Sequence, residues 1–229
     1  MRRHGQNAVV FGLKGSGKTT LTRRLLVDHR RVLIVDPQRE YRQVAVEVGS
    51  MQELADYLER TDGRWRIAYF STQLEQDFPL LCAAAWSIGN LLFVVEEVDR
   101  FCEPAWIPQE LFQIVNYGRH APAGSVDYLA VSRRPADVHR ALTSQAYEIY
   151  CFTIGEPRDV EYLSKLVARD FAEGLPALRP HHFRFMDLYD RSKGWRDVGP
   201  GPLPAGTGDR EPQEPPEREP AEEADGGEL

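Results

Sequence analysis

Apolar residues form short continuous runs along most of the chain, and stretches with helical periodicity separate these runs. Continuous apolar runs bounded by polar turns are typical of strands that are buried on both faces. Strands that alternate with helices indicate a mostly parallel α/β sheet with helices on both faces. The pattern predicts seven strands, at residues 7–11, 31–35, 65–70, 91–95, 126–131, 148–154 and 182–188.

Six helices are expected between these strands, and two of them carry local start signals. Ser50 is followed three residues later by Glu53, which is the pattern of a capping box. Pro108 stands where proline is favoured in the first helical turn. The helices are predicted at residues 18–29, 50–60, 76–88, 108–117, 136–143 and 157–168.

Composition changes near the C-terminus. Residues 195–229 contain three basic and ten acidic side chains, which account for the whole net charge of −7 and leave residues 1–194 neutral. The segment is rich in glycine and proline and has almost no large apolar residue after Trp195. Such a sequence cannot bury enough apolar surface to offset the entropy cost of ordering. We therefore predict one folded domain over residues 1–193 and a disordered acidic tail over residues 194–229.

Several classes of protein are disfavoured. No apolar stretch is long enough for a transmembrane helix, and the apolar run after the basic N-terminus is too short for a signal peptide. The three cysteines form neither a CxxC pair nor a Cys/His cluster, so we expect no cysteine metal site and a reducing, cytoplasmic location.

Residues 12–19 (Gly-Leu-Lys-Gly-Ser-Gly-Lys-Thr) fit the phosphate-binding loop pattern GxxxxGK[ST] at every fixed position. The loop follows a predicted strand and begins a predicted helix, so its backbone N–H groups and the helix N-terminus can bind a polyphosphate. Lys18 is expected at the β- and γ-phosphates, and the Thr19 hydroxyl at Mg²⁺. The motif predicts ATP binding with Mg²⁺ through Gly12, Gly15, Ser16, Gly17, Lys18, Thr19 and Thr20.

Two adjacent acids follow the apolar strand at residues 91–95. Glu96 is predicted to complete the Mg²⁺ site, usually through water, and Glu97 to act as the general base for an attacking water. Uncompensated charges are costly at the end of a buried strand, which favours a functional role over a solvated turn. The pair favours ATP hydrolysis coupled to work, with a nucleotide or small-molecule kinase as an alternative.

Further blocks along the chain, taken in order with these two, are similar to one family. They are residues 32–41 (with Asp36-Pro37 and Glu40-Tyr41), 116–120 (with Gly118-Arg119), 129–138 (with Ser132-Arg133-Arg134-Pro135), 142–145 and 156–159. The set resembles the FtsK–HerA superfamily of DNA-pumping ATPases over residues 9–188, with residues 12–19 as the Walker A and Glu96-Glu97 as the Walker B motif. The resemblance implies a RecA-like P-loop NTPase fold of the ASCE type.

The resemblance also implies roles for other residues. Arg119 matches the arginine finger that reaches into a neighbouring subunit's site, although an arginine there also suits a helix C-terminus. Ser132 and Arg133 match the position of a polar γ-phosphate sensor. Arg133 replaces the family's usual glutamine, and it could sense phosphate as a cation or act in trans. Asp36 and Glu40 fit either a functional segment or turn chemistry around Pro37.

The folded part of the chain corresponds to the ATPase core alone, without accessory domains. It therefore most resembles the small genome-packaging ATPases of tailless internal-membrane phages and archaeal viruses. This implies a homo-oligomeric, hexameric ring that pumps double-stranded DNA, independently of sequence, into a preformed capsid. Expected partners are capsid-vertex or membrane proteins of a virion, and the expected location is the host cytoplasm or the virion. The alternatives are a cellular or plasmid DNA translocase, acting in conjugation or end processing, and a morphogenesis or secretion ATPase that moves protein.

DNA binding by a neutral domain requires a local concentration of positive charge. The first 42 residues contain ten basic and three acidic side chains, and Arg23, Arg24, Arg30 and Arg31 cluster around the first helix and its exit. The cluster fits either contacts with a DNA backbone or a solvated helix face. The acidic tail, in turn, is either a solvated extension or a mimic of DNA.

Overall fold

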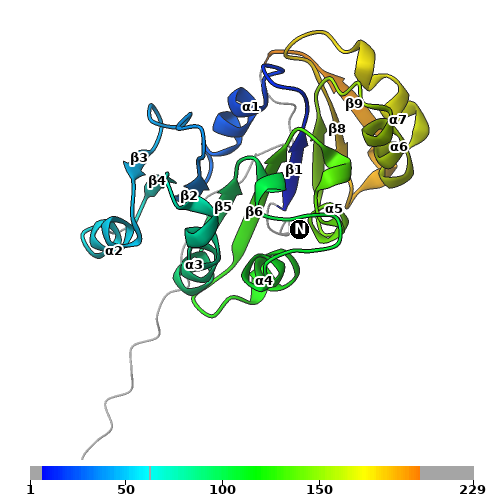
Figure 1. The fold of residues 1–229 in the computed structure, drawn as a ribbon. Coiled ribbons are helices and arrows are strands. Elements are labelled where there is room, and N and C mark those ends of the chain that lie inside the picture. The colour runs from blue at the N-terminus through cyan, green and yellow to red at the C-terminus, as the bar shows by residue number, and fades with distance from the viewer. Residues whose placement is uncertain (1–6, 62, 202–229) are drawn as a thin grey trace, which may run out of the picture.

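The computed structural model describes residues 7–61 and 63–201, and these residues build one mixed sheet covered by helices on both faces (Figure 1). Nine strands of the described residues pair in the order β3-β4-β2-β5-β6-β1-β7-β8-β9. All pairings from β3 to β7 are parallel, and β8 and β9 are antiparallel to their neighbours. The strands are β1 (Ala8–Phe11), β2 (Arg31–Val35), β3 (Val46–Val48), β4 (Trp65–Tyr69), β5 (Leu91–Val95), β6 (Val126–Ser132), β7 (Glu148–Cys151), β8 (Phe183–Asp187) and β9 (Trp195–Val198).

The helices lie between these strands, as the sequence pattern predicts. They are α1 (Lys18–Leu25), α2 (Met51–Glu59), α3 (Leu74–Ile88), α4 (Gln109–Tyr117), α5 (Arg140–Ser144), α6 (Pro157–Leu166) and α7 (Arg169–Glu173). Within the described part of the chain, no helix combines the length and the apolar character that crossing a bilayer requires.

Two hydrophobic cores lie on opposite faces of the sheet, because alternate residues of a strand point to opposite faces. In β2, Leu33 and Val35 join the larger core, which also contains residues of α3 and α4. Val32 and Ile34 join the smaller core, which packs beneath α1. The continuous apolar runs in the sequence are explained by this burial on both faces.

The seven predicted strands are confirmed, but the predicted boundary after residue 193 is wrong. Residues 195–198 form β9, which pairs with β8 at the edge of the sheet. The indole of Trp195 donates a hydrogen bond to Asp170 (3.0 Å), and the guanidinium of Arg184 lies over its ring. A single aromatic anchor and a buried Val198 therefore fix a segment whose composition predicts disorder. The rest of the predicted tail, residues 202–229, lies outside the described residues.

Three helical predictions need correction, and the first is the helix expected at 18–29, which ends at Leu25 as α1. The helix expected at 136–143 is a 3₁₀ turn, η3 (Pro135–Asp137), followed by the short helix α5. The break arises because the buried Asp159 accepts a hydrogen bond from the backbone N–H of Ala136 (3.0 Å), and His139 then caps α5. Helix α7 lies beyond the predicted end at residue 168 and was not expected.

The sheet topology brings four chain segments together at the carboxyl ends of the parallel strands. In register, Phe11 at the end of β1 lies opposite Ser132 at the end of β6, and Val95 at the end of β5 lies opposite Val35 at the end of β2. Ligand sites of open α/β sheets lie at the carboxyl ends of the parallel strands. The residues that follow β1, β2, β5 and β6 are therefore placed to form one site.

Candidate nucleotide-binding site

The phosphate-binding loop leaves β1 at Gly12 and enters α1 at Lys18, as the motif predicts. Its three motif glycines all have positive φ angles, of 153° at Gly12, 75° at Gly15 and 112° at Gly17. A side chain at Gly12 would also place its Cβ 2.6 Å from the Cβ of Phe152. Glycine is needed here because the backbone turns through conformations that other residues rarely adopt. The loop therefore has the geometry that its sequence requires.

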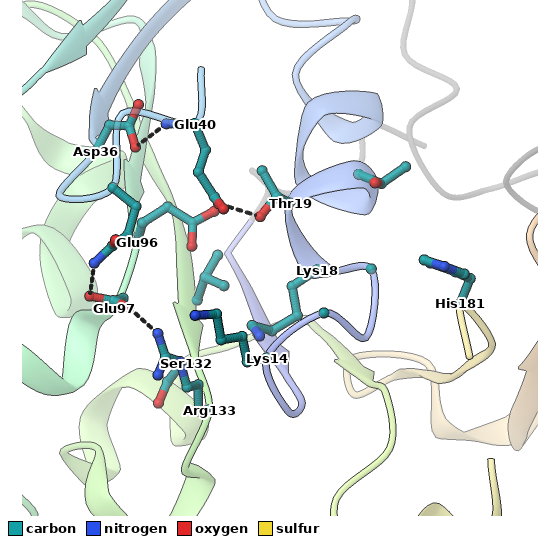
Figure 2. A pocket seen from close by; sticks show the side chains of 15 residues that line it. Lys14, Lys18, Thr19, Asp36, Glu40, Glu96, Glu97, Ser132, Arg133 and His181 are labelled. Atoms are coloured by element: carbon teal, nitrogen blue, oxygen red, sulfur yellow. Dashed lines mark hydrogen bonds and ion pairs between the residues drawn. The ribbon is translucent and has the colours of Figure 1, made fainter. Parts of the chain in front are cut away.

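A cavity of about 260 Å³ lies beside this loop, and Figure 2 shows how side chains from five segments face it. Lys18, Thr19 and Thr20 come from the loop and α1, and the predicted acids follow β5. Gly12 and Ser16 shape the loop without lining the cavity. The full lining is Lys14, Gly15, Gly17, Lys18, Thr19, Thr20, Asp36, Gln38, Glu40, Glu96, Glu97, Val131, Ser132, Arg133 and His181.

Lys18 is held at the mouth of its own loop. Its ammonium donates to the carbonyl oxygens of Gly12 (2.8 Å) and Leu13 (3.0 Å). Burial lowers the pKa of Lys18, and the nearby carboxyl group of Glu96 opposes that shift. The Lys18 ammonium group is thus held by two uncharged carbonyl oxygens, which the oxygens of an anionic ligand can replace.

The segment after β2 contains two acids with different contacts: Asp36 holds the local turn, and Glu40 contacts Thr19. Asp36 is buried and accepts hydrogen bonds from the backbone N–H groups of Glu40 and Tyr41, both at 2.9 Å. Burial raises the pKa of Asp36. Asp36 therefore organises the turn around Pro37, one of the two roles that the sequence left open. The carboxylate of Glu40 instead accepts a hydrogen bond from the Thr19 hydroxyl (2.6 Å).

Glu96 is a second buried acid that lines the cavity. Burial raises its pKa to about 7, and a hydrogen bond from the Tyr41 hydroxyl favours its charged form. Tyr41 is itself fully buried, and burial raises its pKa well above the usual value. This pairing orients the Glu96 carboxyl group next to Thr19 and Glu40, as a Mg²⁺ site would require.

Glu97 adopts the left-handed conformation, with a φ angle of 49°. This strained backbone turns its side chain toward the cavity, where Arg133 contacts one carboxylate oxygen at 2.5 Å. Gln38 donates to the other oxygen at 3.3 Å. The structure thus joins the predicted base to the residue at the predicted sensor position (Figure 2). Ser132, at the end of β6, lines the same cavity and accepts a hydrogen bond from the backbone N–H of Arg134 (3.0 Å).

Arg119 lies outside this cavity. It belongs to the 3₁₀ turn η2 (Gly118–His120), which packs against Val126 at the start of β6. The cavity lies at the other end of β6, and a seven-residue strand spans about 20 Å. The Arg119 Nε donates to His120 at 2.9 Å. Arg119 therefore cannot reach the site of its own chain without a large movement.

Sequence reasoning did not assign roles to Gln38, Tyr41 or His181. His181 has a φ angle of 62°, its backbone N–H donates to the carbonyl oxygen of Ser16 (3.2 Å), and its ring lies beside Gly17. It lines the main cavity and also a second cavity of about 80 Å³, on the far side of the loop. The second cavity has an apolar wall of Leu21, Phe152, Phe183 and Pro200. A polar cavity thus adjoins an apolar one across Gly17.

Neither a protein-family model nor a curated protein sequence matches the chain. Several solved structures match it in fold. The genome-packaging NTPase B204 of Sulfolobus turreted icosahedral virus 2, solved with AMPPCP, has a TM-score of 0.71 at 20% identity, covering 85% of this chain and 97% of that one. The DNA-packaging ATPase B204 of Sulfolobus turreted icosahedral virus has a TM-score of 0.65 at 16% identity, covering 86% and 99%.

VirB4 of Thermoanaerobacter pseudethanolicus is similar to the same extent. Its TM-score is 0.65 at 12% identity, covering 89% of this chain and 92% of that one. The likeness extends over nearly the whole length of each of these chains and includes the sheet that carries the phosphate-binding loop. The chain therefore has the mostly parallel α/β fold of RecA-like P-loop NTPases, the fold that its sequence predicts.

Proposed function

We propose that this chain is an ATPase of the FtsK–HerA superfamily, which hydrolyses ATP with Mg²⁺ and uses the energy to translocate double-stranded DNA. The observation that carries this proposal is the single cavity that gathers Lys18, Thr19, Glu96 and Glu97. A cation for the phosphates, oxygen ligands for a metal and a carboxylate base are the parts that phosphoryl transfer to water needs.

The residues around Thr19 fit Mg²⁺. The Thr19 hydroxyl, the Glu40 carboxylate and the Glu96 carboxyl group offer oxygen atoms, which are the ligands that Mg²⁺ prefers. Glu96 would hold the ion through water, and the buried Tyr41 hydroxyl keeps that carboxyl group oriented. When bound, Mg²⁺ neutralises charge that develops on the phosphate oxygens.

The remaining steps use the chain's own side chains. Lys18 exchanges two backbone carbonyls for phosphate oxygens. Glu97 accepts a proton from water as the water oxygen bonds to the γ-phosphorus, and the bond from that phosphorus to the β–γ bridging oxygen breaks, leaving ADP. Glu97 can act only after it leaves Arg133, and a γ-phosphate competes for that arginine. Arg133 therefore serves as a cationic γ-phosphate sensor within its own chain.

Viral genome packaging is the form of translocation that we propose. The support is the likeness in fold to two proteins named as packaging enzymes, together with the ordered sequence blocks. In this role the chain forms a homo-hexameric ring, and Arg119 acts on the neighbouring subunit's nucleotide. Its partners are then capsid-vertex or membrane proteins of a virion, and it works in the host cytoplasm or in the virion.

A second candidate is a plasmid or cellular translocase that acts in conjugation. It stays open because VirB4, which is not named as a packaging enzyme, has the same TM-score as one of the B204 structures. The fold does not separate the two, because both likenesses lie well below 25% identity.

The test of the proposed function is ATP hydrolysis with and without duplex DNA. We expect duplex DNA to stimulate turnover, and Glu97→Gln to bind ATP while losing hydrolysis by about 10²–10⁴-fold. Gln38→Ala is the matched control, since it removes a neutral contact to the same carboxylate and should retain most activity. Normal turnover by Glu97→Gln would remove Glu97 as the base. Basal turnover that duplex DNA does not change would instead favour an ATPase that moves protein.

A further inference from the structure

Four arginines lie where β2 and β4 begin. The nucleotide cavity lies at the opposite, carboxyl ends of the parallel strands. We call Arg30, Arg31, Arg64 and Arg66 the edge arginines. The two strands lie side by side there, since Arg31 is in register with Trp65 and the backbone N–H of Trp65 donates to the carbonyl oxygen of Arg30 (2.8 Å). The starts of β2 and β4 thus bring together arginines more than 30 positions apart in the chain, with Arg31 on the opposite face of the sheet from Arg66.

Three of these guanidinium groups are held by backbone carbonyls. Arg66 donates to the carbonyl oxygens of Leu26 (3.3 Å) and Val27 (3.2 Å), and Arg64 donates to that of Val27 (3.4 Å). Arg31 donates to the carbonyl oxygen of Gly63 at 3.2 Å. A backbone carbonyl carries no net charge, so these bonds fix the arginines without neutralising them.

Carboxylates do not balance this charge among the described residues. No ion pair joins an edge arginine to an acid in that part of the chain, whereas the exposed Arg158 and Arg169 pair with Asp137 and Glu173. Burial lowers the pKa of Arg66, and the like charge of Arg64 adds to that shift. Asp28 is an exposed acid in the same turn, and Asp62 stands two positions before Arg64 in the sequence, so four arginines still exceed two carboxylates.

The structure also divides the basic cluster that the sequence suggests. Arg23 is bound to the carbonyl oxygen of Glu40 and lies near the Tyr41 ring, and Arg24 is bound to the carbonyl oxygen of Gly201 (2.7 Å). Both are therefore engaged near the nucleotide cavity. Arg30 and Arg31 lie instead at the start of β2, at the end of the sheet opposite the nucleotide cavity.

We propose that the edge arginines bind the phosphate backbone of duplex DNA. This inference rests on the proposed function and names the surface through which the polymer is held. Guanidinium groups donate paired hydrogen bonds to phosphate oxygens, and backbone contacts carry no sequence information. The patch thus supplies the sequence-independent grip that a neutral domain otherwise lacks. Because the patch lies at the opposite edge of the sheet, its neutralisation leaves the ATP site intact.

The test compares two double variants of the full chain with equal changes in charge. Arg30→Gln/Arg64→Gln removes two exposed edge arginines. It keeps Arg66, which is partly buried and donates hydrogen bonds to the carbonyl oxygens of Leu26 and Val27. Arg158→Gln/Arg169→Gln removes two exposed arginines elsewhere. Binding to a fluorescent 30-base-pair duplex is measured over a range of salt concentrations, together with basal and DNA-stimulated ATP hydrolysis.

We expect the edge variant to bind the duplex at least about tenfold more weakly at low salt and to show a salt slope smaller by about 2, since each phosphate contact contributes about 0.9. Its basal hydrolysis should equal that of the wild type, and Arg64→Lys should retain most of the binding. The control double variant should change both quantities less. If the edge variant binds duplex DNA with the affinity and the salt slope of the wild type, the edge arginines do not hold DNA. DNA-stimulated hydrolysis, and with it the proposed function, would still stand. A wild-type protein that neither binds duplex DNA nor responds to it would overturn both.

Discussion

The acids at the end of β5 differ in what holds them. Glu97 is partly exposed and bound to Arg133, whereas Glu96 is buried and receives a hydrogen bond from Tyr41. A buried carboxyl group without a full ionic partner destabilises the fold whenever it is charged. A group that costs stability and lies in a cavity is a candidate for binding a cation.

The charge of Glu96 should therefore make stability depend on pH. Its pKa of about 7 lies above the ordinary value of 4.5, so between these values the folded chain binds more protons than the unfolded chain. Stability then falls as pH rises through this window. Glu96→Gln removes the charge and should stabilise the protein without Mg²⁺ at pH 8, by on the order of 3 kcal/mol.

Thermal unfolding at pH 5 and pH 8, with a chelator present, measures this effect. The gain in Tm should be much smaller at pH 5, where Glu96 is protonated in the folded chain. Glu161→Gln is the control, since Glu161 is exposed and its ion pair with Lys165 lowers its pKa. An equal gain at both pH values would show that Glu96 is not buried in charged form.

The sequence identifies site residues that belong to contiguous motifs and misses those that depend on the path of the chain. Lys18, Thr19, Glu96 and Glu97 are recognisable from their spacing after predicted strands, and the structure brings them together. Tyr41 lies in a recognised block, but its bond to Glu96 depends on how the Asp36 turn folds back. His181 comes from a loop just before β8 with no sequence signal for nucleotide chemistry.

At the scale of elements, strands with continuous apolar runs are predictable and edge strands are not. The seven predicted strands are buried wholly or in large part. Strand β3 has three residues and exposes Val46, so it has neither the length nor the pattern of a strand. Strand β9 is Trp-Arg-Asp-Val, in which Asp197 bonds to Arg184 of β8 and the indole of Trp195 bonds to Asp170 of α7, both of which lie earlier in the chain.

Strand β9 should be needed for stability. A chain ending at Lys193 loses the pairing with β8, the ion pair between Arg184 and Asp197 (2.9 Å) and the packing of Trp195 and Val198. We expect its Tm to fall by at least about 5 °C, since 1 kcal/mol corresponds to about 2–4 °C at this size.

The matched control for this truncation is a chain ending at Gly201, which keeps β9 and the contact between Arg24 and Gly201. Its Tm, followed by circular dichroism, should equal that of the full chain. If the two truncated chains unfold at the same temperature, β9 does not contribute to the fold.

At the scale of the whole molecule, the position of Arg119 has a consequence for assembly. The length of β6, about 20 Å, separates the turn that carries this arginine from the cavity of its own chain. An arginine finger must contact the transferred phosphoryl group, so in the proposed finger role Arg119 would act on the nucleotide of another subunit. Arg119→Ala should assemble normally and hydrolyse ATP slowly, by a factor of up to about 10³–10⁵.

Mixed assemblies test this arrangement. Lys18→Ala chains lack a working nucleotide site but keep Arg119, so mixing them with Arg119→Ala chains should restore part of the activity. Particle mass is measured in parallel to show that mixed assemblies form. A mixture no more active than its two components, in assemblies of the expected mass, would contradict action in trans.

The acidic segment leaves the described fold at a defined place. Arg24 holds Gly201 beside α1, and the 28 residues that follow contain nine acidic and two basic side chains. Arg24 lies in the last turn of α1, and Arg64 and Arg66 bond to the carbonyl oxygens of Leu26 and Val27, only two and three residues further along the chain. A segment of this length and charge can compete with DNA for that patch.

Removal of residues 202–229 should therefore strengthen DNA binding. We expect the chain ending at Gly201 to bind duplex DNA several-fold more tightly at 50 mM salt and to show greater DNA-stimulated hydrolysis. The difference should vanish near 0.5 M salt, where charges are screened beyond about 4 Å. A full-length chain with the nine acids changed to Gln or Asn is the control for charge, and it should behave like the truncated chain. If neither change alters binding at low salt, the segment is an inert extension, and its −7 charge has no part in how this domain holds DNA.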